Sequence, residues 1–200
     1  MRALRVLRKI PMLVARSWAL SWCLYRLSGI RLVGPPDERV WYFAYGANMN
    51  DSVFRGWRGM SPLEWRAGHA RGYRLRFNLE GWPRGRAAPA NLEADPQAEV
   101  WGVLYAITRR DLVRLDASEG IPWWCYHQLW LDTEDAEGNT LRVVTYIAQG
   151  DEIDRRPSLR YITLLREGAR AHGLPDHYLR FLEGLNTRDS PSALMAATSP

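Results

Sequence analysis

The spacing of strand-like segments most constrains how this chain of 200 residues can fold. Apolar or alternating runs with strand composition occur at residues 40–45, 73–77, 99–107, 126–131 and 141–147. This spacing does not match repeating βαβ units, in which every strand is followed by a helix. The chain is therefore expected to form an α+β domain, a small barrel or curled sheet with flanking helices.

Helices are expected at residues 51–57, 108–118, 158–172 and 176–185. The second begins at Thr108, an N-cap residue with Asp111 three positions later, and Gly120 and Pro122 end it. Two loops are also expected. Residues 81–89 are rich in Gly, Pro and Arg, and the polar residues 133–140 read as the connection of a hairpin.

Composition indicates one globular domain, since 46% of the residues are apolar and aromatic residues are plentiful. Gly34-Pro35-Pro36 divides a basic segment, residues 1–36, from a domain at 37–185, and a Ser-, Ala- and Pro-rich tail follows at 186–200. The two cysteines form no disulfide framework, which favours a reducing, cytoplasmic setting. Cys125 is interpreted as a small buried hydrophobe.

The net charge of +5 arises from the first segment alone. Residues 1–36 contain seven basic side chains and no acid, which leaves 20 basic and 22 acidic residues in 37–200. Proteins that bind nucleic acid through phosphate contacts need a basic face, so a nucleic-acid partner is not expected.

The basic segment itself resembles an amphipathic helix, with Leu13, Leu20, Leu24 and Leu27 on one face. Its longest uncharged run, residues 17–25, is too short to span a membrane. Three interpretations stay open: peripheral contact of residues 1–34 with an anionic membrane surface, an organellar transit peptide, or packing against the domain or a partner. Packing is favoured.

The first candidate site element is the end of the strand at residues 40–45. The aromatic run stops at Tyr45-Gly46-Ala47-Asn48, where small residues leave backbone N–H groups uncrowded. Such groups can receive a carboxylate or a developing oxyanion. Many strands end in a glycine turn, so this pattern alone is weak evidence for a site.

The second candidate element is Glu119, which directly follows the helix expected at 108–118. The helix dipole there disfavours a charged carboxylate, and neighbouring aromatic residues would desolvate it. Both effects would raise its pKa toward neutrality and suit a general base that later acts as an acid. On spacing alone, an exposed glutamate with no task is the favoured interpretation. Asp116 lies one turn earlier and could be a surface residue or a residue that supports the site, and the surface position is favoured.

Other chemistries lack support in the sequence. No phosphate-binding loop, dinucleotide fingerprint, hydrolase nucleophile motif or zinc-protease motif occurs. The four histidines have no metal-ligand spacing with one another or with the cysteines. Neither a metal nor a cofactor is expected.

Four collinear motifs resemble the γ-glutamylcyclotransferase family. Residues 42–49 resemble its YFAYGSNM signature, and residues 100–105 with 115–121 are similar to its VxGxxYxL…LDxxEGV block. A tyrosine follows the glutamate at Tyr126, and residues 157–178 resemble the family's PSxxY…GAxxxGLPxxY end. The resemblance covers about residues 40–185.

The resemblance implies a small β-barrel of about six strands with flanking helices, and an enzyme that needs no cofactor. It implies that a γ-glutamyl amine is cleaved to 5-oxoproline and a free amine. Glu119 would be the acid and base that moves protons, and Tyr45, Gly46, Ala47 and Asn48 would hold the glutamyl group. Tyr126 and Tyr146 would supply pocket hydroxyls.

Ala47 departs from the family pattern, which usually has serine there. If that hydroxyl contacts substrate, the chain lacks one hydrogen bond, on the order of 1 kcal/mol. This departure and the basic N-terminal segment motivate an alternative function, a catalytically weak protein of the same fold that binds γ-glutamyl compounds, a membrane or a partner. Trp123 and Trp124 suggest a bulky aromatic rim around the pocket, and the sequence does not name the leaving amine.

Overall fold

The computed structural model describes residues 20, 21, 23, 34–80, 88–119 and 126–189. The elements in chain order are the following: β1 (Arg39–Ala44), η1 (Ala47–Met49), η2 (Ser52–Trp57), β2 (Glu64–Arg76), β3 (Asn91–Thr108), α4 (Arg109–Glu119), β4 (His127–Asp135), β5 (Thr140–Ile147), α5 (Leu159–Ala171) and α6 (Asp176–Gly184).

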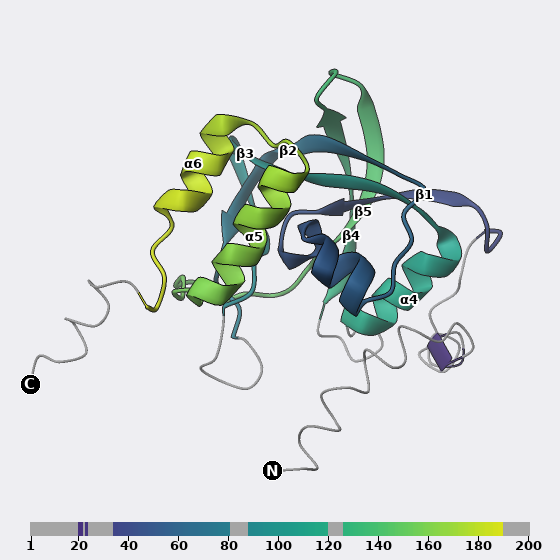
Figure 1. Cartoon of the computed structure of the whole chain (residues 1–200), viewed down its shortest axis with the longest axis horizontal. Coiled ribbons are helices and arrows are strands. Elements are labelled where there is room, and N and C mark those ends of the chain that lie inside the picture. Colours follow the sequence, from purple (N-terminus) through teal and green to yellow (C-terminus); the bar gives the residue numbers. More distant parts are fainter. Residues whose placement is uncertain (1–19, 22, 24–33, 81–87, 120–125, 190–200) are drawn as a thin grey trace, which may run out of the picture.

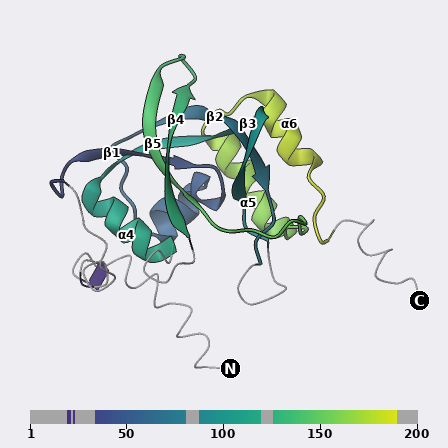
Figure 2. The same cartoon turned by 180° about the vertical axis from the view of Figure 1, so that it is seen from behind.

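In the described part of the chain, five strands close into a barrel in the order β1-β3-β2-β4-β5. Neighbouring strands are antiparallel except β1 and β5, which close the barrel in parallel with Trp41 opposite Val143. Figures 1 and 2 show α5 and α6 side by side on one flank of the barrel and α4 on the other. The α+β barrel with flanking helices is confirmed, with five described strands against about six expected.

Strand β1 lies between β3 and β5, as its apolar composition on both faces predicts. Phe43 and Ala44 near its end are almost completely buried. Tyr42 stacks on Phe54 of η2, which in turn stacks on Tyr105 of β3 with ring centroids 4.3 Å apart. This aromatic stack fixes the turn after β1 against the barrel wall.

Strands β2 and β3 are much longer than the sequence predicts. The pattern at 73–77 and 99–107 missed residues 64–72 and 91–98, where arginines, glycines and Pro96 interrupt the apolar alternation. The register shifts between Arg71 and Tyr73, so residues 95–98 of β3 lie opposite the single Gly72. Pro96 lies in this irregularity, where its missing N–H removes no ladder hydrogen bond.

Helix α5 packs directly on the turn that follows β1. Ser158 caps its N-terminus by accepting a hydrogen bond from the backbone N–H of Tyr161. A Cβ at Gly168 would lie 2.6 Å from the carbonyl carbon of Met49 in η1. The glycine therefore allows a backbone contact that holds η1 in place.

The four expected helices are present with small shifts at their ends. The Thr108 hydroxyl accepts a hydrogen bond from the Asp111 N–H, which confirms the predicted cap of α4. Glu119 is the last residue of that helix and does not follow it. The predicted hairpin connection at 133–140 is too long, because β4 continues to Asp135 and β5 begins at Thr140. The turn itself contains Gly138, with a φ of 85° that favours glycine.

Several expectations fall outside the described residues. These are the amphipathic helix of the basic segment, of which only residues 20, 21 and 23 are described, residues 81–87 of the expected loop, Trp123, Trp124, Cys125 and the tail from residue 190. The division into 1–36, 37–185 and 186–200 stays a prediction. Among the residues that the structure describes, no helix has both the length and the apolar composition needed to cross a membrane.

Candidate active site

A cavity of about 140 Å³ opens where the turn after β1 meets the end of α4. All seven residues proposed from the sequence lie on its wall: Tyr45, Gly46, Ala47, Asn48, Glu119, Tyr126 and Tyr146. The wall is completed by residues that the sequence did not single out for the site: Tyr42, Arg58, Pro89, Ala90 and Tyr161. The cavity thus draws on strands β1 and β5, helices α4 and α5, and the turn containing η1.

Glu119 is the one carboxylate among the described residues that line this cavity. Its side chain is 12% exposed, and Oε1 lies 2.8 Å from Nη2 of Arg58. The same oxygen accepts a hydrogen bond of 3.0 Å from Nδ2 of Asn48. Two donors therefore converge on one carboxylate oxygen, and the guanidinium supplies the opposite charge that a sheltered carboxylate requires.

Asn48 links Glu119 to strand β1. Besides its bond to Glu119, Nδ2 donates to the Tyr42 hydroxyl at 2.8 Å, and Oδ1 accepts from Nε of Arg58 at 2.7 Å. Burial and the nearby charge of Glu119 raise the pKa of the Tyr42 hydroxyl well above its usual value. Tyr42 therefore remains a neutral hydroxyl at physiological pH and does not compete with Glu119 as a base.

Tyr146 and Tyr45 form the wall on the β5 side. The Tyr146 hydroxyl donates to Oδ1 of Asp116 at 2.6 Å, and the Tyr45 hydroxyl donates to the Tyr146 carbonyl oxygen at 2.5 Å. Burial raises the pKa of both phenols well above the usual range. The charge of Asp116 adds to this rise at Tyr146, and nearby Tyr126 adds to it at Tyr45. Because the Tyr146 O–H group donates its hydrogen bond to Asp116, the Tyr146 oxygen offers the cavity a lone pair.

Asp116 is not the surface residue expected from the sequence. Its side chain is fully buried, and it also accepts two hydrogen bonds from Nε2 of Gln128, at 2.8 and 3.0 Å. One signal could have revealed this placement. Asp116 lies four residues after the apolar Leu112, which is buried, so both lie on the same face of α4.

Tyr161 of α5 also lines the cavity. Its hydroxyl accepts the backbone N–H of Ala90 at 2.9 Å and also a backbone hydrogen bond from Ala47. Burial raises the pKa of this hydroxyl to about 12, with the backbone donors opposing the rise. Since two N–H groups occupy its lone pairs, the Tyr161 O–H is oriented to donate. A Cβ at Gly46 would lie 3.1 Å from this oxygen, a tight contact that a glycine avoids.

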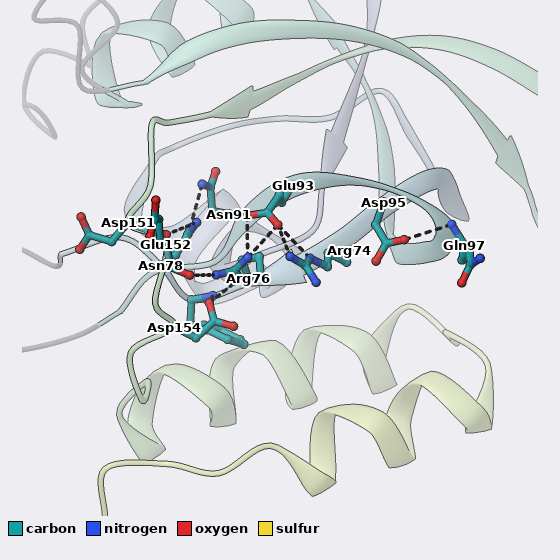
Figure 3. A network of polar contacts seen from close by, with 11 residues as sticks. Arg74, Arg76, Asn78, Asn91, Glu93, Asp95, Gln97, Asp151, Glu152 and Asp154 are labelled. Atoms are coloured by element: carbon teal, nitrogen blue, oxygen red, sulfur yellow. Dashed lines mark hydrogen bonds and ion pairs between the residues drawn. The ribbon is translucent and has the colours of Figure 1, made fainter.

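The wall segment at Pro89 and Ala90 is fastened by a polar network at the ends of β2 and β3 (Figure 3). Asn91 donates to the Ala148 carbonyl at 2.9 Å and accepts the Ala148 N–H at 3.1 Å, which ties the start of β3 to the end of β5. Arg76 lies between Glu93 and Asp154, with separations of 2.6 and 2.7 Å. The network therefore fixes two walls of the cavity relative to each other.

No cluster of three or more His, Cys, Asp or Glu side chains suited to a metal ion occurs within the described ranges. The cavity wall contains one base, one guanidinium and several neutral phenols, a set suited to moving protons beside a polar substrate.

Comparison with known proteins supports the fold indicated by the motifs. Residues 99–182 match the AIG2-like family. A solved structure of a γ-glutamyl cyclotransferase superposes with a TM-score of 0.67 at 23% identity, covering 77% of this chain and 92% of that one. This chain has the γ-glutamylcyclotransferase fold.

Curated relatives of the γ-glutamylcyclotransferase fold are similar over most of the chain. The human γ-glutamylcyclotransferase is 27% identical over 79% of this chain and 85% of its own length. The γ-glutamyl cyclotransferase aclK of Aspergillus oryzae is 29% identical over 72% of this chain and 60% of its own length. The alignments thus extend well beyond the matched family segment.

Proposed function

We propose that this protein is a γ-glutamylcyclotransferase, which releases 5-oxoproline and a free amine or amino acid from a γ-glutamyl compound. The single observation that carries the proposal is Glu119, a carboxylate on a cavity wall otherwise made of a guanidinium and neutral groups. The names of the human and Aspergillus relatives support the same activity.

The reaction would be intramolecular. The α-amine nitrogen of the glutamyl group attacks its own γ-carbonyl carbon, and the bond from that carbon to the leaving nitrogen breaks. The α-ammonium loses two protons as the lactam forms, and the leaving nitrogen gains two when it departs as an ammonium. Glu119 would carry each proton in turn through Oε2, since Oε1 is held by Arg58 and Asn48.

The walls of the cavity have the polarity that a glutamyl group requires. The Tyr146 oxygen and Glu119 present lone pairs suited to the α-ammonium. The Tyr161 hydroxyl and the Gly46–Asn48 turn are suited to a carboxylate or a developing oxyanion. Holding the two ends of one molecule in a ring-closing geometry can lower the barrier by up to about 7–11 kcal/mol.

The direct test is release of 5-oxoproline from a panel of γ-glutamyl amino acids and γ-glutamyl amines. Glu119→Gln keeps the shape of the side chain but removes the base, so kcat should fall by about 100-fold or more. Glu64→Gln is the matched control, because Glu64 also pairs with arginines, Arg39 and Arg66, but does not line the cavity. Its activity should equal that of the wild type.

The alternative is a binding protein of the same fold, which Ala47 favours because the usual serine hydroxyl is missing. Tight binding of γ-glutamyl compounds without any 5-oxoproline release would support that alternative. Activity that is undiminished in Glu119→Gln would contradict the assignment of the base.

A further inference from the structure

Arg58 engages every nitrogen of its guanidinium with the protein. Nε donates to Oδ1 of Asn48 at 2.7 Å, Nη1 donates to the Ser118 hydroxyl, and Nη2 lies 2.8 Å from Oε1 of Glu119. These partners come from the turn after β1 and from the last two residues of α4. One side chain therefore joins the two halves of the candidate site.

The backbone of Arg58 is also fixed. Arg58 is the C-cap of η2, and its N–H donates to the Val53 carbonyl oxygen at 2.9 Å. The neighbouring η2 residue Phe54 is fully buried in the core. The side chain is only 21% exposed, so the guanidinium is anchored at both ends and sheltered from solvent.

We infer that Arg58 is a positioning residue that orients the Glu119 carboxylate for proton transfer. This inference rests on the proposed function, in which Glu119 is the acid and base. A glutamate side chain has several rotatable bonds, and its proton transfer requires one arrangement. Arg58 and Asn48 both hold Oε1 of Glu119. The described residues provide no hydrogen-bond partner for Oε2, so this oxygen is available to the substrate.

The geometry also predicts which kinetic constant depends on Arg58. Three of the five guanidinium N–H groups already have protein partners, one of them Glu119, so we expect the side chain to act mainly through Glu119. A residue of this kind contributes mainly after substrate has bound, and its removal lowers kcat more than it raises KM. Removal of a residue that bound the substrate carboxylate would raise KM more than it lowered kcat.

The test compares Arg58→Ala and Arg58→Lys with the wild type in 5-oxoproline release. For Arg58→Ala, kcat should fall by about 10- to 100-fold, as expected for loss of a charged hydrogen bond, while KM changes by less than about threefold. The kcat of Arg58→Lys should lie between those of Arg58→Ala and the wild type, because lysine keeps the charge but lacks the planar guanidinium that binds several acceptors at once.

Guanidinium ion at millimolar concentration, well below denaturing levels, supplies the missing group in solution. It should raise kcat of Arg58→Ala, whose side-chain space is empty, and leave Arg58→Lys and Glu119→Gln unchanged. A purely structural role of Arg58 would not give this rescue. The control is Arg109→Ala, which removes an arginine side chain that is 15% exposed from its ion pair with the more exposed Glu38, at the other end of α4. It should keep wild-type kcat and show no rescue.

Three results would overturn the inference while the wild type is active: unchanged kcat in Arg58→Ala, a loss confined to KM, or no rescue by guanidinium. If Arg58→Ala fails to fold, a wild-type kcat in folded Arg58→Lys would overturn it. A wild-type protein that releases no 5-oxoproline from any panel substrate contradicts the proposed function, and the inference falls with it.

Discussion

Nδ2 of Asn48 donates a hydrogen bond of 3.0 Å to Oε1 of Glu119, 71 residues away in sequence. The bond joins the turn that ends β1 to the last residue of α4. The turn is therefore more than a surface for the glutamyl group, because its asparagine side chain also holds the carboxylate proposed to move the protons.

Replacing Asn48 should separate catalysis from stability. Asn48→Ala removes the bonds to Glu119, Tyr42 and Arg58, and kcat for 5-oxoproline release should fall by about 10-fold or more. Asn50→Ala is a matched control, since both asparagines are 7% exposed. Asn50 bonds instead to Glu167 of α5 and to Ser52.

Both asparagine variants should lose about 1–3 kcal/mol of unfolding free energy in urea denaturation, because each breaks several hydrogen bonds of a buried side chain. Only Asn48→Ala should lose kcat. Equal kcat in the two variants would show that the Asn48–Glu119 bond has no catalytic consequence.

Local patterns in the sequence were enough to predict the helices, because these signals lie within a few residues, but they marked the turn and Glu119 only as candidates, and the family resemblance was needed to favour them. Arg58 could not be predicted in the same way. It lies in Gly56-Trp57-Arg58-Gly59, a stretch without a motif, and it meets Glu119 only because η2 ends beside α4. Tyr161 was visible as part of a family motif, but its role as a donor depends on Ala47 and Ala90, which are distant in sequence.

The same reasoning explains the errors in the strands. The alternation of apolar and polar residues predicts a strand only where one face is apolar, and the missed part of β2, residues 64–72, instead carries arginines at positions 66 and 71. Both are paired with carboxylates of the neighbouring strand β4, Asp135 and Glu134. Such pairing is a tertiary property that composition does not reveal.

The Tyr161 hydroxyl is expected to donate to the substrate. Tyr161→Phe removes this donor and leaves the N–H groups of Ala90 and Ala47 without their acceptor. We expect kcat/KM to fall by about 10-fold or more, and the unfolding free energy to fall by about 1–3 kcal/mol.

Tyr178→Phe is the control for that variant. Tyr178 is also buried, but its hydroxyl has no hydrogen-bond partner among the described residues. Removing an unpaired buried hydroxyl should leave stability unchanged or raise it, and activity should not change. An active Tyr161→Phe enzyme with unaltered kcat/KM would exclude the proposed donor role.

Asp135 should make stability depend on pH. Hydrogen bonds from the Asn139 side chain, together with backbone N–H groups and Arg66, lower the pKa of this carboxyl from 3.8 to about 2. A carboxyl whose pKa is lowered in the folded state contributes its full stabilisation when the pH is above its pKa in the unfolded chain. This contribution is lost as the pH falls through its pKa in the folded protein.

The unfolding free energies of the wild type and Asp135→Asn, measured from pH 6 to pH 2, should therefore converge. Their difference should shrink by about 2 kcal/mol between about pH 5 and pH 2. Asn139→Ala removes the largest single cause of the lowered pKa, so the pH-dependent part of the difference should become smaller. A constant difference over the whole range would contradict the assignment.

Ala47 decides how closely this site follows the family pattern. Ala47 lines the cavity and its backbone bonds the Tyr161 hydroxyl, so a serine hydroxyl at this position is expected to come within reach of the substrate. One added hydrogen bond to substrate contributes about 1 kcal/mol, so Ala47→Ser should lower KM by up to about fivefold and leave kcat unchanged. Ala90→Ser is the control, because Ala90 lines the same wall beside Tyr161 and should give no gain. An unchanged KM in Ala47→Ser would mean that a side-chain hydroxyl at position 47 does not contact the substrate.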